Sequence, residues 1–92
     1  MIKSFKHKGA QRLFETGSAA GVQAAHKERL SRQLTALNRA KSQRDMNQPG
    51  WVLHPLKGDE AGVWSVTVSG NWRLTFTFEG EDAVLVDYRD YH

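Results

Sequence analysis

Six side chains in the second half of this sequence carry groups suited to cleaving a phosphodiester bond. They fall at the ends of predicted strands or on the polar side of a predicted sheet, and they are His54, Lys57, Arg73, Asp90, Tyr91 and His92. Cleavage of RNA without a metal needs a base for the 2′-hydroxyl proton, cations near the phosphate and an acid for the departing 5′-oxygen. Imidazole, with an ordinary pKa of about 6.5, can be either base or acid, whereas Lys and Arg remain cationic. The set therefore suits metal-free phosphodiester chemistry.

The cationic and aromatic members of this set suggest separate tasks. Lys57 and Arg73 are candidates for holding the phosphate, because strand alternation places Arg73 on the face opposite Trp72. Tyr91 is a candidate to stack on a base or to share in proton transfer. A terminal carboxylate beside His92 would favour the protonated imidazolium, which suits an acid. Taken singly, each of these residues also fits an ordinary surface or chain-end side chain.

Other kinds of active site are not indicated by the sequence. It has no glycine-rich phosphate loop, no HExxH segment and no serine in a nucleophile elbow, so we expect neither a cofactor nor a metal. Cysteine is absent from all 92 residues, which excludes disulfides and thiolate metal sites. The apolar run at residues 83–86 is too short to span a membrane. We expect a cytoplasmic, single-domain protein over residues 1–92, with a shallow active site.

Charge is divided unevenly along the chain. Residues 1–50 contain ten Lys and Arg against three Asp and Glu, whereas residues 51–92 contain three against seven. A basic half suits a polyanion, because each neutralised phosphate releases condensed counterions. The same pattern also fits a solvated basic helix, so charge alone leaves both interpretations open.

Hydrophobic spacing predicts that the first half of the chain is mainly helical. Residues 2–5 suggest a short strand, and residues 9–16 a short helix that Gly17 ends. A longer amphipathic helix is predicted over residues 22–41. Its apolar positions recur at helical spacing and are Val22, Ala25, Leu30, Leu34 and Leu37. We expect this apolar stripe to pack against the protein's own sheet.

The second half of the chain is predicted to form strands, because apolar and polar residues alternate after residues 48–50, where Pro and Gly interrupt regular structure. Strands are predicted over residues 51–54, 64–68, 72–78 and 83–88, with turns at 57–62, 69–70 and 80–82. Consecutive strands joined by short turns form an antiparallel meander. The predicted fold class is α+β, with a sheet of about four strands packed against two N-terminal helices.

Five short segments together carry a resemblance to a known family. They are MIKSFKHKG at residues 1–9, LHPLKGD at 53–59, WSVTV at 64–68, NWR at 71–73 and DYH at 90–92. In order, spacing and position at both chain ends, they resemble the HigB toxins of the RelE/ParE superfamily. The resemblance implies a small antiparallel sheet on N-terminal helices, with the active site on the exposed, concave face of the sheet.

The resemblance also implies an activity and a set of site residues. Known relatives cleave messenger RNA in the ribosomal A site. The residues that match the family's site are the cleavage residues His54, Asp90, Tyr91 and His92 and the RNA-binding residues Lys57, Asn71 and Arg73. Which of them is the general base and which the general acid stays open.

Two kinds of partner are implied by the same resemblance. The basic N-terminal helices would meet ribosomal RNA, and the candidate contacts are Arg29, Arg32, Arg39 and Lys41. An antitoxin with a helix-turn-helix DNA-binding domain would neutralise the toxin and repress their operon. The chain itself would then reach operator DNA only through that antitoxin.

Two other functions remain open at this point. The superfamily also contains gyrase inhibitors that cut no RNA, and the basic half alone would suit a simple RNA-binding module. His54 and the Tyr91-His92 end favour the nuclease. Substituting the histidines should abolish the effect of a nuclease, whereas reversing the charge of Arg29, Arg32 and Arg39 should dominate in a binding module.

Overall fold

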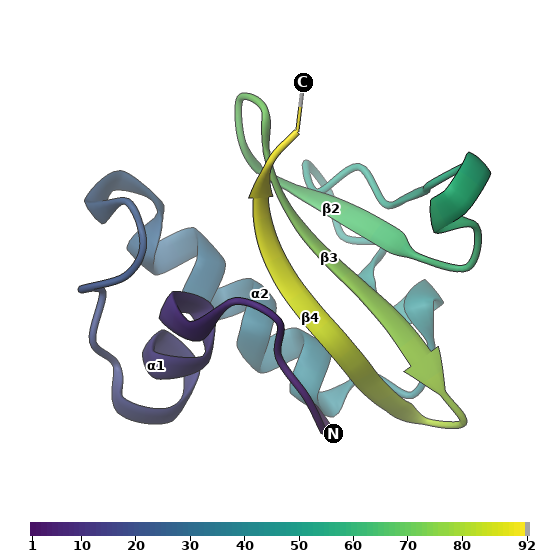
Figure 1. Ribbon diagram of the computed structural model, residues 1–92, viewed down its shortest axis with the longest axis horizontal. Coiled ribbons are helices and arrows are strands. Elements are labelled where there is room, and N and C mark those ends of the chain that lie inside the picture. Colours follow the sequence, from purple (N-terminus) through teal and green to yellow (C-terminus); the bar gives the residue numbers. More distant parts are fainter. Residues whose placement is uncertain (92) are drawn as a thin grey trace.

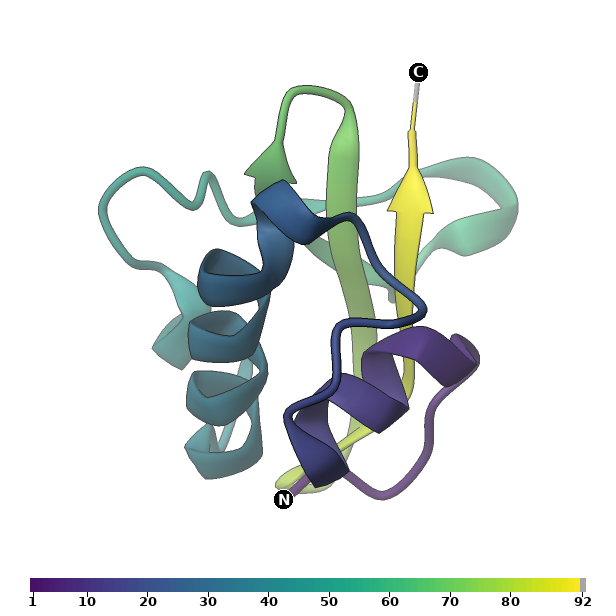
Figure 2. The same cartoon turned by 90° about the vertical axis from the view of Figure 1, so that its left-hand side faces the viewer.

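The computed structural model describes residues 1–91 and has an α+β architecture, as the sequence predicts. A four-stranded antiparallel sheet carries the helices on one of its faces (Figures 1 and 2). The main elements are α1 (Lys8–Thr16), α2 (Lys27–Arg39), β1 (His54–Pro55), β2 (Trp64–Ser69), β3 (Trp72–Glu79) and β4 (Asp82–Asp90). Three short 3₁₀ turns are η1 (Ala24–His26), η2 (Gln43–Met46) and η3 (Gly58–Glu60).

Helix α1 lies within one residue of its prediction, and both of its ends are capped. The imidazole Nδ1 of His7 accepts the backbone N–H of Ala10 at 3.0 Å, which satisfies a donor of the first turn. Gly17 ends the helix in the left-handed conformation, at φ +80°, and its N–H donates to the Leu13 carbonyl.

Helix α2 is shorter than the predicted segment 22–41. Gln23 is extended, and its N–H donates to the Tyr88 hydroxyl at 3.4 Å, so the regular helix begins only after η1. Leu30, Leu34 and Leu37 are wholly buried as expected. The prediction was wrong for the first turns, where Val22 is only partly buried and Ala25 is exposed.

The sheet follows the predicted meander, in the order β1-β2-β3-β4. Alternate residues of its strands, such as Val66, Leu74 and Phe76, have no exposed surface and form one core with the leucines of α2. β4 runs beyond the predicted strand 83–88 to Asp90, which pairs with Trp72. This extension carries the end of the chain to the hairpin between β2 and β3 (Figure 1).

Two predicted strands are not regular strands in the structure. Residues 2–5 make only isolated parallel bridges to β4, Ile2 with Ala83 and Phe5 with Val86. In the predicted strand 51–54, only the last residue lies in β1, because Val52 adopts a left-handed backbone with φ +53° that interrupts the pairing. Both segments still follow the sheet edge through backbone hydrogen bonds.

An aromatic cluster fastens the helical layer to the end of β4. The rings of Trp72 and Tyr88 stack at 4.5 Å, and the Tyr88 hydroxyl lies 2.6 Å from Nδ1 of His26. Burial raises the pKa of Tyr88 above its ordinary value of 10.0.

Over residues 1–91, no helix has both the length and the apolar character needed to cross a membrane.

Candidate active site on the outer face of the sheet

A cleft of about 260 Å³ opens on the face of the sheet opposite the helices. It is lined by seven residues from the loop before β1, from β1 to β3 and from the chain end, namely Val52, His54, Leu56, Ser65, Thr67, Arg73 and Tyr91. Three of the predicted site residues, His54, Arg73 and Tyr91, therefore share one cleft although they lie far apart in the sequence.

His54 lies on the edge strand β1, where its backbone pairs with Ser65 of β2. The side chain is exposed, and the Ser65 hydroxyl donates to the His54 carbonyl at 3.4 Å. The next residue, Pro55, lacks a backbone N–H, which an edge strand tolerates. The imidazole is thus presented at the rim of the cleft by a short but defined piece of sheet.

Arg73 is held by the hairpin that precedes it. Its guanidinium Nη1 donates to the carbonyl of Gly70 at 2.6 Å and to that of Trp72 at 3.3 Å. Gly70 has φ +56°, a conformation that glycine adopts without strain. The predicted position on the face opposite Trp72 is confirmed, because Arg73 lines the cleft. The fold therefore fixes a half-buried cation in the lining of the cleft.

The end of the chain lies against the hairpin between β2 and β3. The backbone N–H of Tyr91 donates to the carbonyl of Asn71 at 2.7 Å, and 45% of the Tyr91 surface is exposed. Asp90 pairs with Trp72 and is not among the described residues that line the cleft. Asn71 therefore supports Tyr91 through its backbone carbonyl. His92 lies outside the described residues.

Lys57 follows β1 in an extended conformation, immediately before η3. Its side chain is exposed, and among the described residues it is not one of those that line the cleft. Its carbonyl accepts the N–H of Glu60, which closes the turn. Lys57 therefore lies on a loop whose position depends on how η3 is attached to the sheet.

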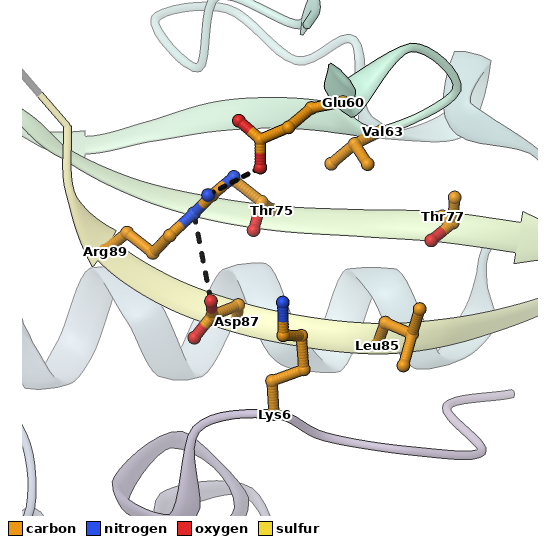
Figure 3. Close-up of a pocket in the computed structure, with 8 residues that line it drawn as sticks. All are labelled: Lys6, Glu60, Val63, Thr75, Thr77, Leu85, Asp87 and Arg89. Carbon is orange, nitrogen blue, oxygen red and sulfur yellow. Dashed lines mark hydrogen bonds and ion pairs between the residues drawn. The ribbon is translucent and has the colours of Figure 1, made fainter.

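A second, smaller hollow of about 50 Å³ lies beside the cleft on the same face (Figure 3). At its centre, Nη1 of Arg89 is 2.7 Å from Oε1 of Glu60, and Nε of Arg89 is 3.8 Å from Oδ2 of Asp87. The Arg89 guanidinium also lies 5.7 Å from the centre of the Tyr91 ring. The other residues that line this hollow are Lys6, Val63, Thr75, Thr77 and Leu85.

The polar face of the sheet is less open than the alternation of residues suggests. Ser65 and Thr75, which alternation places opposite the core, are only 3% and 2% exposed. The loop that contains η3 folds over this face, and Glu60 from that loop reaches Arg89 across β3 (Figure 3). Sequence reasoning did not single out Val52, Glu60 or Arg89. The only available signal was strand parity, which places Arg89 on the same face as Arg73, its register partner.

The four basic residues predicted to contact ribosomal RNA are not equivalent. Arg32 and Arg39 are exposed on α2, and exposed Lys41 lies 4.0 Å from Glu81. Arg29 is half-buried, and its guanidinium donates to the carbonyl of Gly50 at 2.7 Å and to that of Thr67 at 3.4 Å. It fixes the loop that leads into the cleft.

The sequence of the chain matches a known family. A family model described as the RelE-like toxin HigB of type II toxin–antitoxin systems matches residues 3–92. The chain belongs to this HigB family. It is also 49% identical over 92 residues to the endoribonuclease HigB of Proteus vulgaris, and the alignment covers 100% of both chains. Two helices and a four-stranded antiparallel sheet agree with this assignment.

Membership of the HigB family defines one partner of the chain. A toxin of a type II system is paired with a protein antitoxin, so an antitoxin is a partner of this HigB-family toxin. The family match includes all of the elements that line the cleft, from the loop before β1 to the chain end.

Proposed function

We propose that this HigB-family chain is an endoribonuclease that cleaves messenger RNA in the ribosomal A site. The observation that supports it most directly is the cleft, in which an imidazole, a guanidinium and a phenol from His54, Arg73 and Tyr91 line one space. The printed name of the Proteus vulgaris relative, endoribonuclease HigB, supports the same activity. Identity over the full length of that relative favours a nuclease over a gyrase inhibitor or a simple RNA-binding module.

The proposed reaction is attack of the 2′-hydroxyl on the neighbouring phosphorus, without a metal. A base removes the hydroxyl proton, the 2′-oxygen bonds to phosphorus, and the bond to the 5′-oxygen breaks as an acid protonates that oxygen. The products are a 2′,3′-cyclic phosphate and a 5′-hydroxyl. Among residues 1–91, no three His, Asp or Glu side chains lie together as metal ligands would.

The roles of the site residues follow from their chemistry. His54 and His92 supply the two imidazoles for proton transfer, and Asp90 acts with them at the chain end. Arg73 and Lys57 stabilise the charge on the phosphorus centre, because they remain cationic at neutral pH. Tyr91 stacks on a base or shares in the proton transfer, and Asn71 belongs to the RNA-binding surface.

Dependence on the ribosome is part of the proposal. The cleft is shallow and offers few groups that could read a base, so the A site would supply the orientation of the RNA that the protein lacks. Arg32, Arg39, Lys41 and Arg29 would contact ribosomal RNA, and the toxin would act in the cytoplasm. The antitoxin would carry a helix-turn-helix domain and connect the toxin to operator DNA.

The test is cleavage of a defined message with and without programmed ribosomes, with the ends mapped. We expect cuts only with ribosomes, and His54→Ala should lower the rate by about 100-fold or more, the usual contribution of a general acid or base. Because the His54 side chain is exposed and lies outside the core, the melting temperature should stay unchanged.

A paired variant separates chemistry from binding in the same assay. Arg32→Glu with Arg39→Glu should weaken ribosome binding and raise KM, with little effect on the rate at saturation. Wild-type activity with His54→Ala, or a message left intact by the wild type, would contradict the proposal. Supercoiling by gyrase would be measured on the same preparations.

A further inference from the structure

The structure assigns a positioning role to the ion pair between Glu60 and Arg89, and this inference rests on the proposed nuclease function. We infer that the pair clamps two parts of the active site together: the loop that carries Lys57, and the Tyr91 ring at the end of the chain. Neither Glu60 nor Arg89 is itself among the described residues that line the cleft. They act on the reaction through the residues that they hold.

The first step of the argument is the geometry of the contact. Nη1 of Arg89 is 2.7 Å from Oε1 of Glu60, and their side chains are only 27% and 37% exposed. A charge-assisted hydrogen bond of this length, partly shielded from water, is stronger than an ordinary surface ion pair. Figure 3 shows the two side chains meeting above β3, with Glu60 coming from the loop and Arg89 from β4.

The second step is what each partner is attached to. Glu60 closes η3, and its backbone N–H donates to the carbonyl of Lys57, so fixing Glu60 fixes the loop after β1. Beneath the contact, Thr75 is only 2% exposed, as expected if the loop stays over the sheet. The two ends of this loop are anchored by Leu56, which is 7% exposed and donates its N–H to the Val63 carbonyl, whereas no residue of η3 between them is buried. The ion pair of Glu60 with Arg89 therefore ties the exposed middle of the loop to β4.

The third step is the second contact of the guanidinium. Arg89 lies 5.7 Å from the centre of the Tyr91 ring, within the range of a cation–π interaction. Its Nε lies 3.8 Å from Oδ2 of Asp87, a neighbour on the same face of β4. One guanidinium therefore contacts both the loop of Lys57 and the ring of Tyr91.

The experiment is a set of double-mutant cycles read by the rate of message cleavage on ribosomes. Glu60→Gln should slow cleavage by about tenfold or more, since a misplacement of about 1 Å can cost on the order of 100-fold. In the Glu60→Gln background, Lys57→Ala should then cost less than it does in the wild type. Such coupling is what a positioning role predicts and a purely structural role does not.

A charge swap separates the two contacts of Arg89. The swap is made in an Asp87→Asn background, because the Asp87 carboxylate would otherwise repel a new carboxylate at position 89. In that background, Glu60→Arg and Arg89→Glu should each be slow alone, because like charges then meet, whereas the double variant should regain the Lys57 coupling. The Tyr91 contact should stay lost in the double variant, so Tyr91→Ala should cost less there than in the wild type. Asp59→Asn, which removes a neighbouring exposed charge from η3, is the matched control and should cleave at the wild-type rate.

Additive effects in both cycles, or a swap no better than its single variants, would overturn the clamp. If the wild type does not cleave, the proposed function fails, and hydrogen exchange of the η3 backbone still tests the clamp. Exchange there should be several-fold faster in Glu60→Gln than in Asp59→Asn, and equal exchange would overturn the inference.

Discussion

Arg73 and His54 line the same cleft, but the structure holds them very differently. The Arg73 guanidinium is fixed by the carbonyls of Gly70 and Trp72, whereas the His54 side chain is exposed at the rim. A fixed cation needs little reorganisation when negative charge develops, which is how electrostatic catalysis gains its effect. An exposed imidazole can exchange protons with water between turnovers. The two residues thus suit different parts of one reaction.

Arg73→Lys tests whether this fixed geometry matters beyond charge. A guanidinium can bond the Gly70 carbonyl with one N–H and present another N–H to the phosphate. Lysine keeps the positive charge but has no planar group that could do both. We expect cleavage to fall by about 10-fold to 100-fold, mainly in the rate at saturation, measured on programmed ribosomes. Arg32→Lys on the exposed face of α2 is the control. Equal activity of Arg73→Lys and wild type would show that charge alone is enough.

For single residues, the sequence predicted which side chains could take part in the chemistry better than it predicted which contacts they make. His54, Arg73 and Tyr91 were recognisable by residue type and by their place at strand ends, and the cleft brings them together. Arg89 and Glu60 were not recognisable, because their contact joins a loop to a strand two positions away in the sheet. Such a contact depends on how the loop folds over the face, which residue spacing does not specify.

The elements around the cleft contain two left-handed residues that are not glycine. Val52 and Leu85 both have φ +53°, and both side chains are exposed, at 65% and 53%. Leu85 lies where the register between β3 and β4 shifts. Val52 lies between Trp51, whose carbonyl accepts the N–H of Thr67 in β2, and His54, which pairs with Ser65 of β2. A left-handed residue turns the chain sharply, so it changes the direction in which the residues beside it point. At Val52, the neighbour presented to the cleft is His54.

Glycine at either position should relieve backbone strain. We expect Val52→Gly and Leu85→Gly each to raise the free energy of unfolding by about 1 kcal/mol, since the left-handed conformation costs that much for other residues. Urea unfolding measures the change. Of the two variants, only Val52→Gly alters the cleft, so Leu85→Gly should keep the wild-type cleavage rate. A loss of stability in both would mean that the exposed side chains contribute more than the strain costs.

The helices and the hairpins of the sheet were predictable because their signals are local. Gly17 ends α1, and alternation gives β2 and β3 almost to the residue. The start of α2 and the course of residues 51–54 were not predictable. The start of α2 depends on a hydrogen bond to the distant Tyr88 hydroxyl. The course of residues 51–54 depends on Val52, whose left-handed backbone is one that valine rarely adopts.

At the scale of the whole molecule, the helical layer also contacts the end of β4, the strand that leads to Tyr91. Tyr88 is 3% exposed, stacks on Trp72 and contacts Nδ1 of His26. The same strand carries Arg89 and Asp90 immediately afterwards. One buried ring therefore joins the segment before α2 to the strand that carries the chain end.

Tyr88 should make stability depend on pH in the alkaline range. Burial raises its pKa in the folded state above the ordinary value of 10.0, so the unfolded chain loses this proton first. The stabilisation is present below about pH 10 and is lost as pH rises toward the folded pKa. In urea unfolding, the fall in stability above about pH 10 should be smaller for Tyr88→Phe than for wild type. Identical slopes would contradict the raised pKa.

The most direct test of the central claim replaces a single oxygen of the substrate. A message that carries one 2′-deoxynucleotide on the 5′ side of the mapped cut would be given to the protein on programmed ribosomes, beside the all-ribose message. If the cleft activates the 2′-hydroxyl, cleavage at that position stops, while the all-ribose message yields a 2′,3′-cyclic phosphate and a 5′-hydroxyl. Cleavage of the deoxy position at the same rate would show another nucleophile and contradict the proposed mechanism.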